Sequence, residues 1–541
     1  GAAQLLSSAA PFYLGLRAEA IAPDSLDTRG NVPLCMFQYS RLFGSSRVPG
    51  EVEDKLVTTQ TAVGHVVVLS HGRAWSLRII DGLHDASAGV WDGWSNARAS
   101  NDLEITGPHK RPSVASVGEI AAALAEIERR TAQMGSNMLP VSLLSTLPRH
   151  EWAAHRKALQ QACDVNSVSL KVIESSLLVL SLCRDAPTDA ASLCKATHEG
   201  GEHGGCLWYD KPLTLIIYAN GMAGAHMEHA HFDAPVTSRA FAFIARAIED
   251  GDADPAAGPS PPLAAGSSDA LARLSHLTFD LSTLPSVRQA MGPARAAFAA
   301  LSANNDLVPV RFDGVGGQAL RAAKIPPDSL MQMALQLAQW RDQHKLVATY
   351  ETATTRRFLH GRTETIRSCS IEVAAFVRAM DELGSTGSAN ARHKVAARIA
   401  LAKAMKEHMD WLSACSSGKG VDRHLMGLRI AAAEAGEPQP LFFEDVGYKL
   451  SSHFELSTSN MSKPGIARPT ADFSGFGAPS RNSYGVCYDI GNEYISMIIS
   501  TDRSCATRDA ARFGRVIQQA LADISSLLLD APTHEKARSR L

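Results

Sequence analysis

The stretch HMEHAHFD, residues 226–233, sets three histidines and two carboxylates within eight positions. Imidazole and carboxylate groups at this density suit either a divalent metal site or acid–base catalysis by one histidine. A zinc protease needs the spacing HExxH, and His226, His229 and His231 do not have it. His229 and His231 would share one face of a strand, but no third ligand is apparent, so we expect no metal site.

His229 and Asp233 also form the pattern HxxxD. This pattern is found in acyltransferases that use coenzyme A, where the imidazole takes a proton from a hydroxyl or thiol and the carboxylate fixes its orientation. Taken alone, the pattern is weak, and a buried structural histidine fits it better.

The composition bounds the kind of protein that carries these residues. The 541 residues are 45% hydrophobic and 20% charged, which provides for two substantial domains. A formal net charge of -2 without basic runs argues against a nucleic-acid partner. Nine cysteines without a CxxC pair indicate a reducing compartment, and no apolar run has the length of a transmembrane segment.

The two ends of the chain bear on localisation. The N-terminus has no basic region ahead of an apolar block, so it does not resemble a secretory signal. The last residues, Ser539, Arg540 and Leu541, are a variant of the SKL address, which predicts a peroxisomal protein that an import receptor binds. The alternatives are the mitochondrial matrix and the cytoplasm.

Periodicity predicts mixed α and β structure on both sides of one flexible insertion, residues 249–270, which is rich in Pro, Gly, Ala and Ser. Helices are expected at 117–130, 329–340 and 395–412, and strands at 65–69, 213–218 and 494–500.

Several blocks of the chain, in order from Pro33 onward, resemble the carnitine/choline acyltransferase family. They are PLCMFQYSRLFGSSRVPG (33–50), LPRHEWAAHRKAL, LWYDKPL, MAGAHMEHAHFDAP, YETATTRRFLHGRTETIRS (350–368), GKGVDRHLMGL (418–428), LSTSN (456–460) and YGVCYDI (484–490). The resemblance implies two domains like chloramphenicol acetyltransferase, each a mixed β-sheet flanked by helices, with an active-site tunnel between them. We expect them at 1–282 and 283–541, with the boundary near Ser282.

The resemblance also implies roles for individual residues. His229 corresponds to the catalytic base and Asp233 to the acidic residue that follows it. The hydroxyl of Ser459, the last residue of the Ser-Thr-Ser motif, would donate to the oxyanion of the tetrahedral intermediate, an interaction whose loss typically costs about 100- to 1000-fold in rate. The acyl group would pass directly between coenzyme A and the acceptor, without an acyl-enzyme.

Carnitine and choline differ by a carboxylate, and the family enzymes that act on carnitine place an arginine and a threonine where choline acetyltransferases have asparagine. The corresponding residues are Arg423 and Thr363. Tyr350, Ser457 and Thr458 are the further carnitine contacts that the resemblance implies. A guanidinium binds a carboxylate through two parallel hydrogen bonds, so carnitine is the expected acceptor.

Coenzyme A is the expected co-substrate, with no permanently bound cofactor. Arg321, Lys324 and Asp328 correspond to its binding segment, which departs from the family in having Gly317 in place of a lysine and Pro326 in place of a serine. Small residues at Ser474 and Gly475, where short-chain enzymes carry methionine, favour medium-chain acyl groups, although short chains are compatible.

Three alternatives stay open at this point. The chain could be a choline O-acetyltransferase, or a catalytically impaired coenzyme A and carnitine binder. The changed Gly317 region motivates the second of these, as does our expectation that the family's substantial N-terminal helical segment is missing before Pro33. A metal-binding protein built on the histidine cluster is the third. We expect a monomer.

Overall fold

The computed structural model describes residues 1–26, 31–59, 63–83, 112–135, 140–201, 204–251, 268–385, 391–462 and 472–529. The tripeptide 539–541 and most of the insertion at 249–270 lie outside these residues. The described chain forms two compact units, residues 1–303 with 358–360 and residues 304–357 with 361–541. In this part of the chain, no helix is both long and apolar enough to cross a membrane.

The division between the units falls after Ala303, later than the boundary expected near Ser282. The reason is α8, Pro285–Asn304, which buries Val287 and Met291 against the first unit. A helix that contributes to a core belongs to the unit that holds this core, and the sequence around Ser282 does not by itself reveal that packing.

The first unit is built on a six-stranded sheet in the order β10-β4-β3-β7-β8-β9. From β10 to β9, the successive pairings are antiparallel, antiparallel, parallel, parallel and antiparallel. Its strands are β3 (His65–Ser70), β4 (Arg73–Arg78), β7 (Val179–Cys183), β8 (Leu213–Tyr218), β9 (Ala223–Met227) and β10 (Leu274–Leu277).

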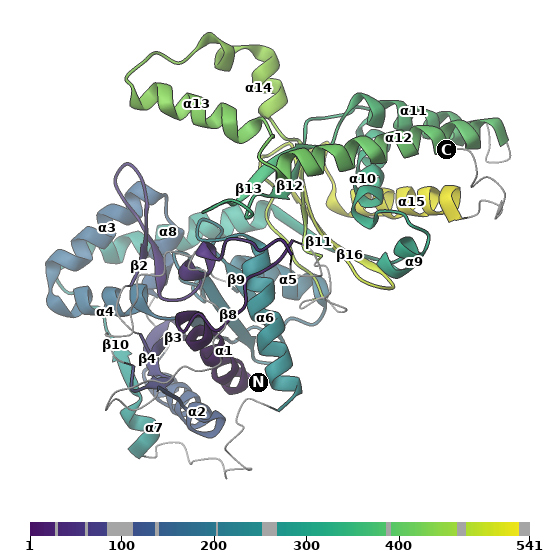
Figure 1. The fold of residues 1–541 in the computed structure, drawn as a ribbon. Coiled ribbons are helices and arrows are strands. Elements are labelled where there is room, and N and C mark those ends of the chain that lie inside the picture. The colour runs from purple at the N-terminus through teal and green to yellow at the C-terminus, as the bar shows by residue number, and fades with distance from the viewer. Residues whose placement is uncertain are drawn as a thin grey trace. The chain divides into compact units, whose positions relative to one another are not determined.

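Helices cover both faces of this sheet (Figure 1). In β3, Val66 and Val68 pack into one hydrophobic core and Val67 and Leu69 into another, as the alternation of side chains along a strand requires. The helices are α1 (Ala2–Arg17), α2 (Val117–Gln133), α3 (Arg149–Ala162), α4 (Asp164–Ser175), α5 (Ala190–Glu199), α6 (Ala234–Glu249), α7 (Ser268–Ala272) and α8. Shorter elements are η1 (Phe37–Arg41), η3 (Val141–Thr146), and the two-stranded ribbons β1 (Ser45–Val48) with β2 (Lys55–Thr58) and β5 (Ile80–Asp81) with β6 (Ser113–Val114).

The second unit repeats the same order of pairings in the sheet β11-β16-β15-β14-β12-β13. Its strands are β11 (Asn305–Phe312), β12 (Thr349–Thr354), β13 (Thr363–Arg367), β14 (Leu456–Asn460), β15 (Tyr484–Ile490) and β16 (Ile495–Asp502). Its helices are α9 (Gly317–Ala322), α10 (Pro327–Gln343), α11 (Ile371–Ser385), α12 (Ala391–Ser416), α13 (Asp422–Glu434), η4 (Leu441–Glu444), α14 (Val446–Ser452) and α15 (Ala510–Leu529).

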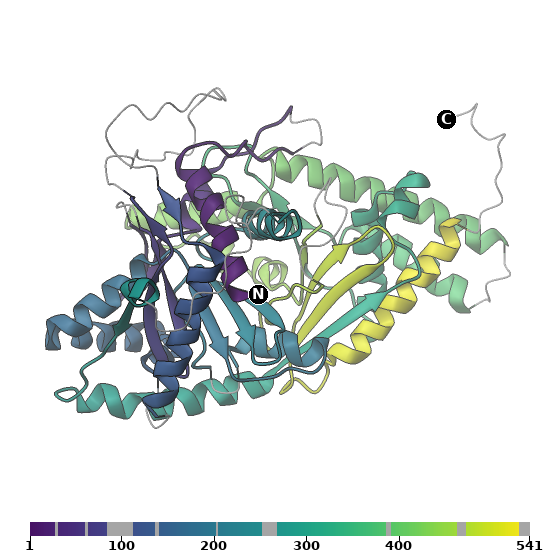
Figure 2. The same cartoon turned by 90° about the horizontal axis from the view of Figure 1, so that it is seen from below.

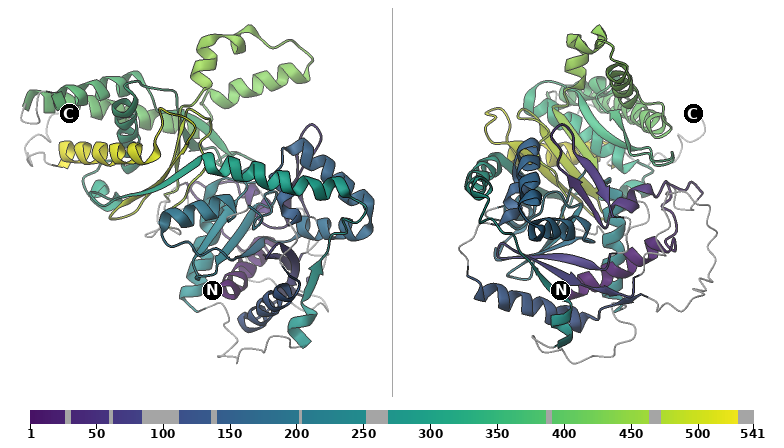
Figure 3. Two further views of the ribbon diagram at one scale, coloured as in Figure 1. Left: turned by 180° about the vertical axis from the view of Figure 1, so that it is seen from behind. Right: turned by 90° about the vertical axis from the view of Figure 1, so that its left-hand side faces the viewer.

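One face of the second sheet carries the core. Tyr484, Val486 and Tyr488 of β15 pack with apolar side chains of α10 and α15, and Figure 2 shows α15 running along the strands. The alternate positions, including Gly485 and Cys487, point to the other face. We call that other side the Ser459 face. In contrast to these helices, α13 buries no residue and extends away from the sheet together with α14 (Figure 3).

The fold expected from the sequence, mixed sheets with flanking helices, is therefore confirmed. The predicted strands at 65–69, 213–218 and 494–500 correspond to β3, β8 and β16, and the predicted helices at 117–130, 329–340 and 395–412 lie within α2, α10 and α12. Because Ser116 and Glu119 form a capping box at the start of α2, its N-terminus falls where the sequence places it.

Candidate functional site

His229 lies in the turn that leads from β9 into α6, and its side chain is exposed. Its ring atom Nδ1 is 3.1 Å from the carbonyl oxygen of Phe232. A carbonyl oxygen only accepts hydrogen bonds, so this contact requires the proton to be on Nδ1. In the neutral imidazole, Nε2 then carries the lone pair that a general base needs.

Asp233 is held by Gln38 through both ends of the glutamine amide. Nε2 of Gln38 donates to Oδ2 of Asp233 at 2.8 Å, and the backbone N–H of Asp233 donates to Oε1 of Gln38 at 2.7 Å. Both side chains are buried, and Asp233 is the N-cap residue of α6. Gln38 thus fixes both the backbone and the carboxylate of Asp233, the last residue of the HxxxD pattern, a role that the sequence does not reveal.

Charged residues from other sequence blocks that resemble the family hold the segment before His229 in place. Glu228 accepts a hydrogen bond from the backbone N–H of Ala230 at 2.9 Å and pairs with Arg47 at 2.9 Å. Arg47 and Arg149 share Asp54, at 2.6 Å and 2.7 Å. The chain of ion pairs continues from Arg149 to Asp210 at 2.6 Å, so side chains from four of these sequence blocks meet behind the histidine turn.

Burial changes the ionisation of several groups in this region. It raises the pKa of Asp210 to about 6, against the opposing effect of Arg149, and lowers the pKa of Lys211 to about 7. It also lowers the pKa of His226 to about 4 and that of His231 to about 3. His226 and His231 are therefore neutral at pH 7, which suits structural histidines in the first unit.

In the second unit, the Ser-Thr-Ser motif forms β14 and its three residues divide between the faces. Ser457 and Ser459 lie on the Ser459 face, and Tyr350 of β12 joins them there because it is paired in register with Ser457. Thr458 points to the helices, is 1% exposed, and donates to the carbonyl oxygen of Tyr350 at 2.9 Å. The expected carnitine contact at Thr458 is thus a supporting residue in this geometry.

Thr363 and Arg423 lie together, as the resemblance implies for two residues that bind one carboxylate. Nε of Arg423 donates to the carbonyl oxygen of Thr363 at 3.0 Å, and Nη2 donates to its hydroxyl at 3.2 Å. The Arg423 side chain is exposed, and a guanidinium has five N–H groups in all, so donors remain for an incoming carboxylate.

Arg367 and Asp422 fix the start of the helix that carries Arg423. The guanidinium of Arg367 contacts both carboxylate oxygens of Asp422, at 3.0 Å and 2.7 Å, and also donates to the carbonyl oxygen of Ser451 at 2.6 Å. Since α13 has no buried residue, these contacts have a large share in positioning Arg423. Arg367 stands in a motif block, but its role depends on Asp422, 55 residues away.

Gly475, one of the two residues expected at the acyl pocket, lies next to β16. A Cβ atom at Gly475 would come within 2.8 to 3.0 Å of three side-chain atoms of Ile498. Ile498 lies on the Ser459 face because it is paired with Cys487. The missing side chain at Gly475 therefore lets the segment approach Ile498 closely, so Gly475 does not by itself open space for methylenes. This leaves Ser474 as the more direct support for a wide pocket.

The residues expected to bind coenzyme A divide into two groups. Arg321 lies on α9, where its guanidinium donates to Asn492 at 2.8 Å, and the exposed Lys324 follows that helix. A Cβ atom at Gly317 would lie 2.7 Å from Nη1 of Arg321, so this arginine occupies the space beside the glycine that replaces a lysine. Asp328, in contrast, accepts hydrogen bonds from Asn460 at 2.7 Å and Tyr488 at 2.6 Å, on the helical side of the sheet.

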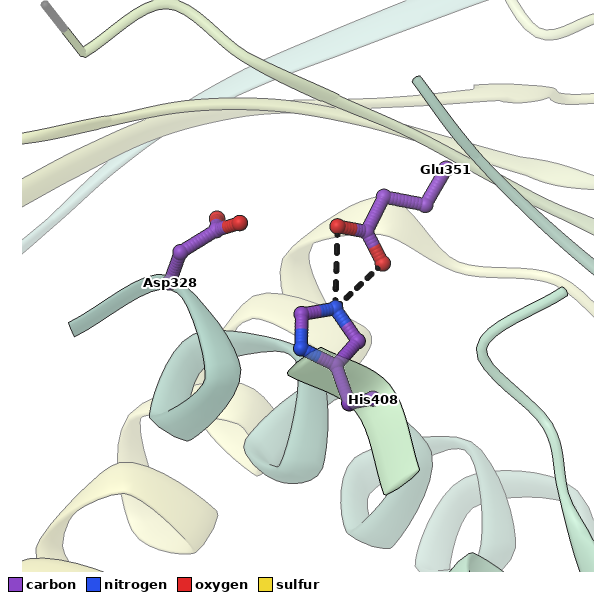
Figure 4. A group of neighbouring side chains, drawn as sticks. All are labelled: Asp328, Glu351 and His408. Carbon is purple, nitrogen blue, oxygen red and sulfur yellow. Dashed lines mark hydrogen bonds and ion pairs between the residues drawn. The ribbon is translucent and has the colours of Figure 1, made fainter. Parts of the chain in front are cut away.

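Asp328, Glu351 and His408 have ligand atoms within 4.8 Å of one another, as a metal site would (Figure 4). In this structure, however, Nε2 of His408 lies 2.8 Å and 3.0 Å from the Glu351 oxygens, and Ser368 also donates to Glu351. Burial raises the pKa of Glu351. Burial alone would lower the pKa of His408, but the charge and the hydrogen bond of Glu351, together with the charge of Asp328, raise it. The arrangement is that of a buried hydrogen-bonded pair.

Comparisons with known proteins agree with this geometry. The family model described as "Choline/Carnitine o-acyltransferase" matches residues 1–519. Carnitine O-acetyltransferase of Columba livia is 29% identical over 93% of this chain and 73% of its own length, and choline O-acetyltransferase of Danio rerio is 28% identical over the same shares. Carnitine O-acetyltransferase of Homo sapiens is 27% identical over 98% of this chain and 77% of its own length.

Solved structures show only distant likeness. A chloramphenicol acetyltransferase aligns with a TM-score of 0.21 and 9% identity over 40% of this chain and 88% of its own. A wax ester synthase/diacylglycerol acyltransferase of Marinobacter aquaeolei aligns with a TM-score of 0.31 and 11% identity over 65% and 79%. The assignment therefore rests on the family model and on the sequence relatives: the chain belongs to the choline/carnitine O-acyltransferase family and is an acyltransferase.

Proposed function

We propose that the protein is a carnitine O-acyltransferase, which moves an acyl group reversibly between coenzyme A and L-carnitine. The observation that carries the choice of acceptor is the contact between Arg423 and Thr363. An exposed guanidinium beside a hydroxyl suits the carboxylate of carnitine and gives no advantage for choline, which has none. Relatives of both kinds are similarly identical, so overall identity does not decide between them.

The proposed chemistry begins with a proton transfer. Nε2 of His229 takes the proton from the hydroxyl of carnitine, while Nδ1–H stays hydrogen-bonded to Phe232. The carnitine oxygen attacks the thioester carbonyl, and the hydroxyl of Ser459 donates to the oxyanion of the tetrahedral intermediate. Collapse of the intermediate breaks the C–S bond, and the departing thiolate takes the proton from the imidazolium. General base catalysis of this kind contributes about 100- to 10,000-fold.

Binding of the two substrates uses different parts of the second unit. The carboxylate of carnitine would bind Arg423, Thr363 and Tyr350, while Arg321 and Lys324 would meet the phosphates of coenzyme A. We propose a preference for medium-chain acyl groups, supported by the small side chain of Ser474. A bulky side chain there would take space, and each buried methylene of the acyl group is worth about 0.8 kcal/mol.

Steady-state kinetics of two variants test the proposal. Arg423→Met should raise the KM for carnitine by about 10- to 100-fold, because a charge-assisted hydrogen bond is lost, and should leave the KM for acyl-CoA unchanged. Ser459→Ala should lower kcat by about 100- to 1000-fold. Exposed Arg246 on α6 provides a matched control, Arg246→Met, with no expected effect. An enzyme that prefers choline, or whose KM for carnitine does not depend on Arg423, would contradict the proposal.

A further inference from the structure

Helix α10 turns polar side chains into the core of the second unit. Asp328, Gln332 and Gln336 follow one another at intervals of four residues, so they form one stripe along the helix, which we call the α10 stripe. Gln332 and Gln336 are 0% exposed. A buried amide is unfavourable unless it is hydrogen-bonded, and leucine would satisfy the packing at the same positions. The stripe therefore calls for an explanation beyond the core.

Each member of the α10 stripe binds a strand of the sheet. Nε2 of Gln332 donates to the hydroxyls of Thr458 at 3.0 Å and Tyr488 at 2.9 Å. Nε2 of Gln336 donates to the hydroxyl of Thr349 at 3.0 Å. Asp328 accepts from Asn460. The strands that receive these contacts are β12, β14 and β15, and the first two carry the ligand positions of the Ser459 face.

The bound positions flank those ligand positions along the chain. Thr458 and Asn460 stand on either side of Ser459 in β14, and Thr349 stands directly before Tyr350 in β12. Side chains alternate along a strand, so a contact on the helical side of a flanking residue sets the depth and tilt of the residue between. The hydrogen bond from the hydroxyl of Thr458 to the carbonyl oxygen of Tyr350 links the two strands at the same place.

A buried pair completes the arrangement on the other side of Tyr350. Glu351 follows Tyr350, is 2% exposed and is bound by His408 of α12, which is 3% exposed. The hydroxyl of Ser329 lies 2.9 Å from Nδ1 of His408, so α10 and α12 hold Glu351 together. Figure 4 shows the imidazole pointing at the Glu351 carboxylate, with Asp328 beside it.

We propose that the α10 stripe and His408 are positioning residues, which fix Ser459 and Tyr350 for oxyanion and carnitine binding. The inference rests on the proposed function, and none of these residues needs to touch a substrate. Gln332 acts next to Ser459, so its loss should reduce kcat. His408 acts through Glu351 next to Tyr350, so its loss should weaken carnitine binding.

The test compares variants of the full chain by steady-state kinetics. Gln332→Met removes two hydrogen bonds at nearly constant volume and should lower kcat by about 10-fold or more. His408→Leu should raise the KM for carnitine by about 10-fold, with the KM for acyl-CoA unchanged, and His408→Gln, which keeps a donor, should restore it. Gln339→Met is the matched control. Gln339 is a 0% exposed residue of the same helix whose side-chain amide has no hydrogen-bond partner in the described part of the chain.

Folding is checked by circular dichroism and thermal unfolding, and Thr458→Val replaces Gln332→Met if the latter does not fold. A selective change in kcat for the Gln332 variant and in the carnitine KM for the His408 variant supports the inference. Equal changes for Gln339→Met, equal changes in both KM values, or no change at all would overturn it while the wild-type activity stands. An inactive wild-type protein would overturn the proposed function together with the inference.

Discussion

Gln38 provides a sharp test of the histidine turn because its amide makes two defined contacts with Asp233. Gln38→Met keeps the volume and removes both. A hydrogen bond to a carboxylate contributes about 1.5 to 3 kcal/mol, and a neutral one about 0.5 to 1.5 kcal/mol. We therefore expect the free energy of unfolding to fall by about 2 to 4.5 kcal/mol.

The same change should affect the reaction. Asp233 ends the turn that begins at His229, and the carbonyl oxygen that orients the imidazole belongs to Phe232, directly before Asp233. A displacement of about 1 Å at a reacting group can cost about 100-fold in rate, so we expect kcat to fall by about 10- to 100-fold. The KM for carnitine should change little, since the proposed carnitine contacts lie in the second unit.

Denaturant unfolding measures the first effect and thiol release from acyl-CoA the second. Gln38→Glu should be at least as harmful near pH 7, where a second carboxylate would face Asp233, and should partly recover as acid protonates the pair. Gln289→Met on α8 replaces an exposed glutamine of the same unit and should be neutral. A Gln38→Met protein with unchanged stability and unchanged kcat would refute the reasoning.

Three further predictions concern other parts of the molecule. Burial lowers the pKa of His231 to about 3, so between this value and the unfolded pKa near 6.5 the unfolded state binds the extra proton. The free energy of unfolding should then fall on acidification through this range by about 1.4 kcal/mol per pH unit for this group, and a His231→Gln variant whose urea-unfolding pH profile matches the wild type would contradict this. Arg367→Met should raise the KM for carnitine, because Asp422 loses its partner at the start of α13, and an unaltered KM would show that Arg423 is positioned otherwise. Gly475→Met should push against Ile498 and lower the ratio of octanoyl to acetyl transfer, while an unchanged ratio would separate this position from the acyl chain.

The sequence was most informative where local chemistry decides the structure. The β-branched run of β3 and the capping box of α2 specify their elements without help from distant residues. The resemblance assigns Thr363 and Arg423 to the carboxylate of carnitine, which stays a prediction, and the structure places the two side chains within hydrogen-bonding distance of each other.

The parts that escaped prediction depend on long-range contacts. Gln38 and Asp233 are 195 residues apart, and neither segment contains a pattern that predicts their contact. Apolar periodicity predicts helix α10, but it does not distinguish the buried Gln332 and Gln336 from exposed glutamines, because their partners come from β12, β14 and β15. The small size of Gly475 suggests open space, because the sequence alone does not show that Ile498 lies against this glycine.

The most direct measurement is thiol release from octanoyl-CoA and acetyl-CoA by the purified protein, with L-carnitine, choline or no acceptor, beside His229→Ala. The account predicts release that requires carnitine, is much weaker with choline, and disappears in the His229→Ala protein. Release that persists without His229, or a folded protein that transfers no acyl group to carnitine, would contradict it.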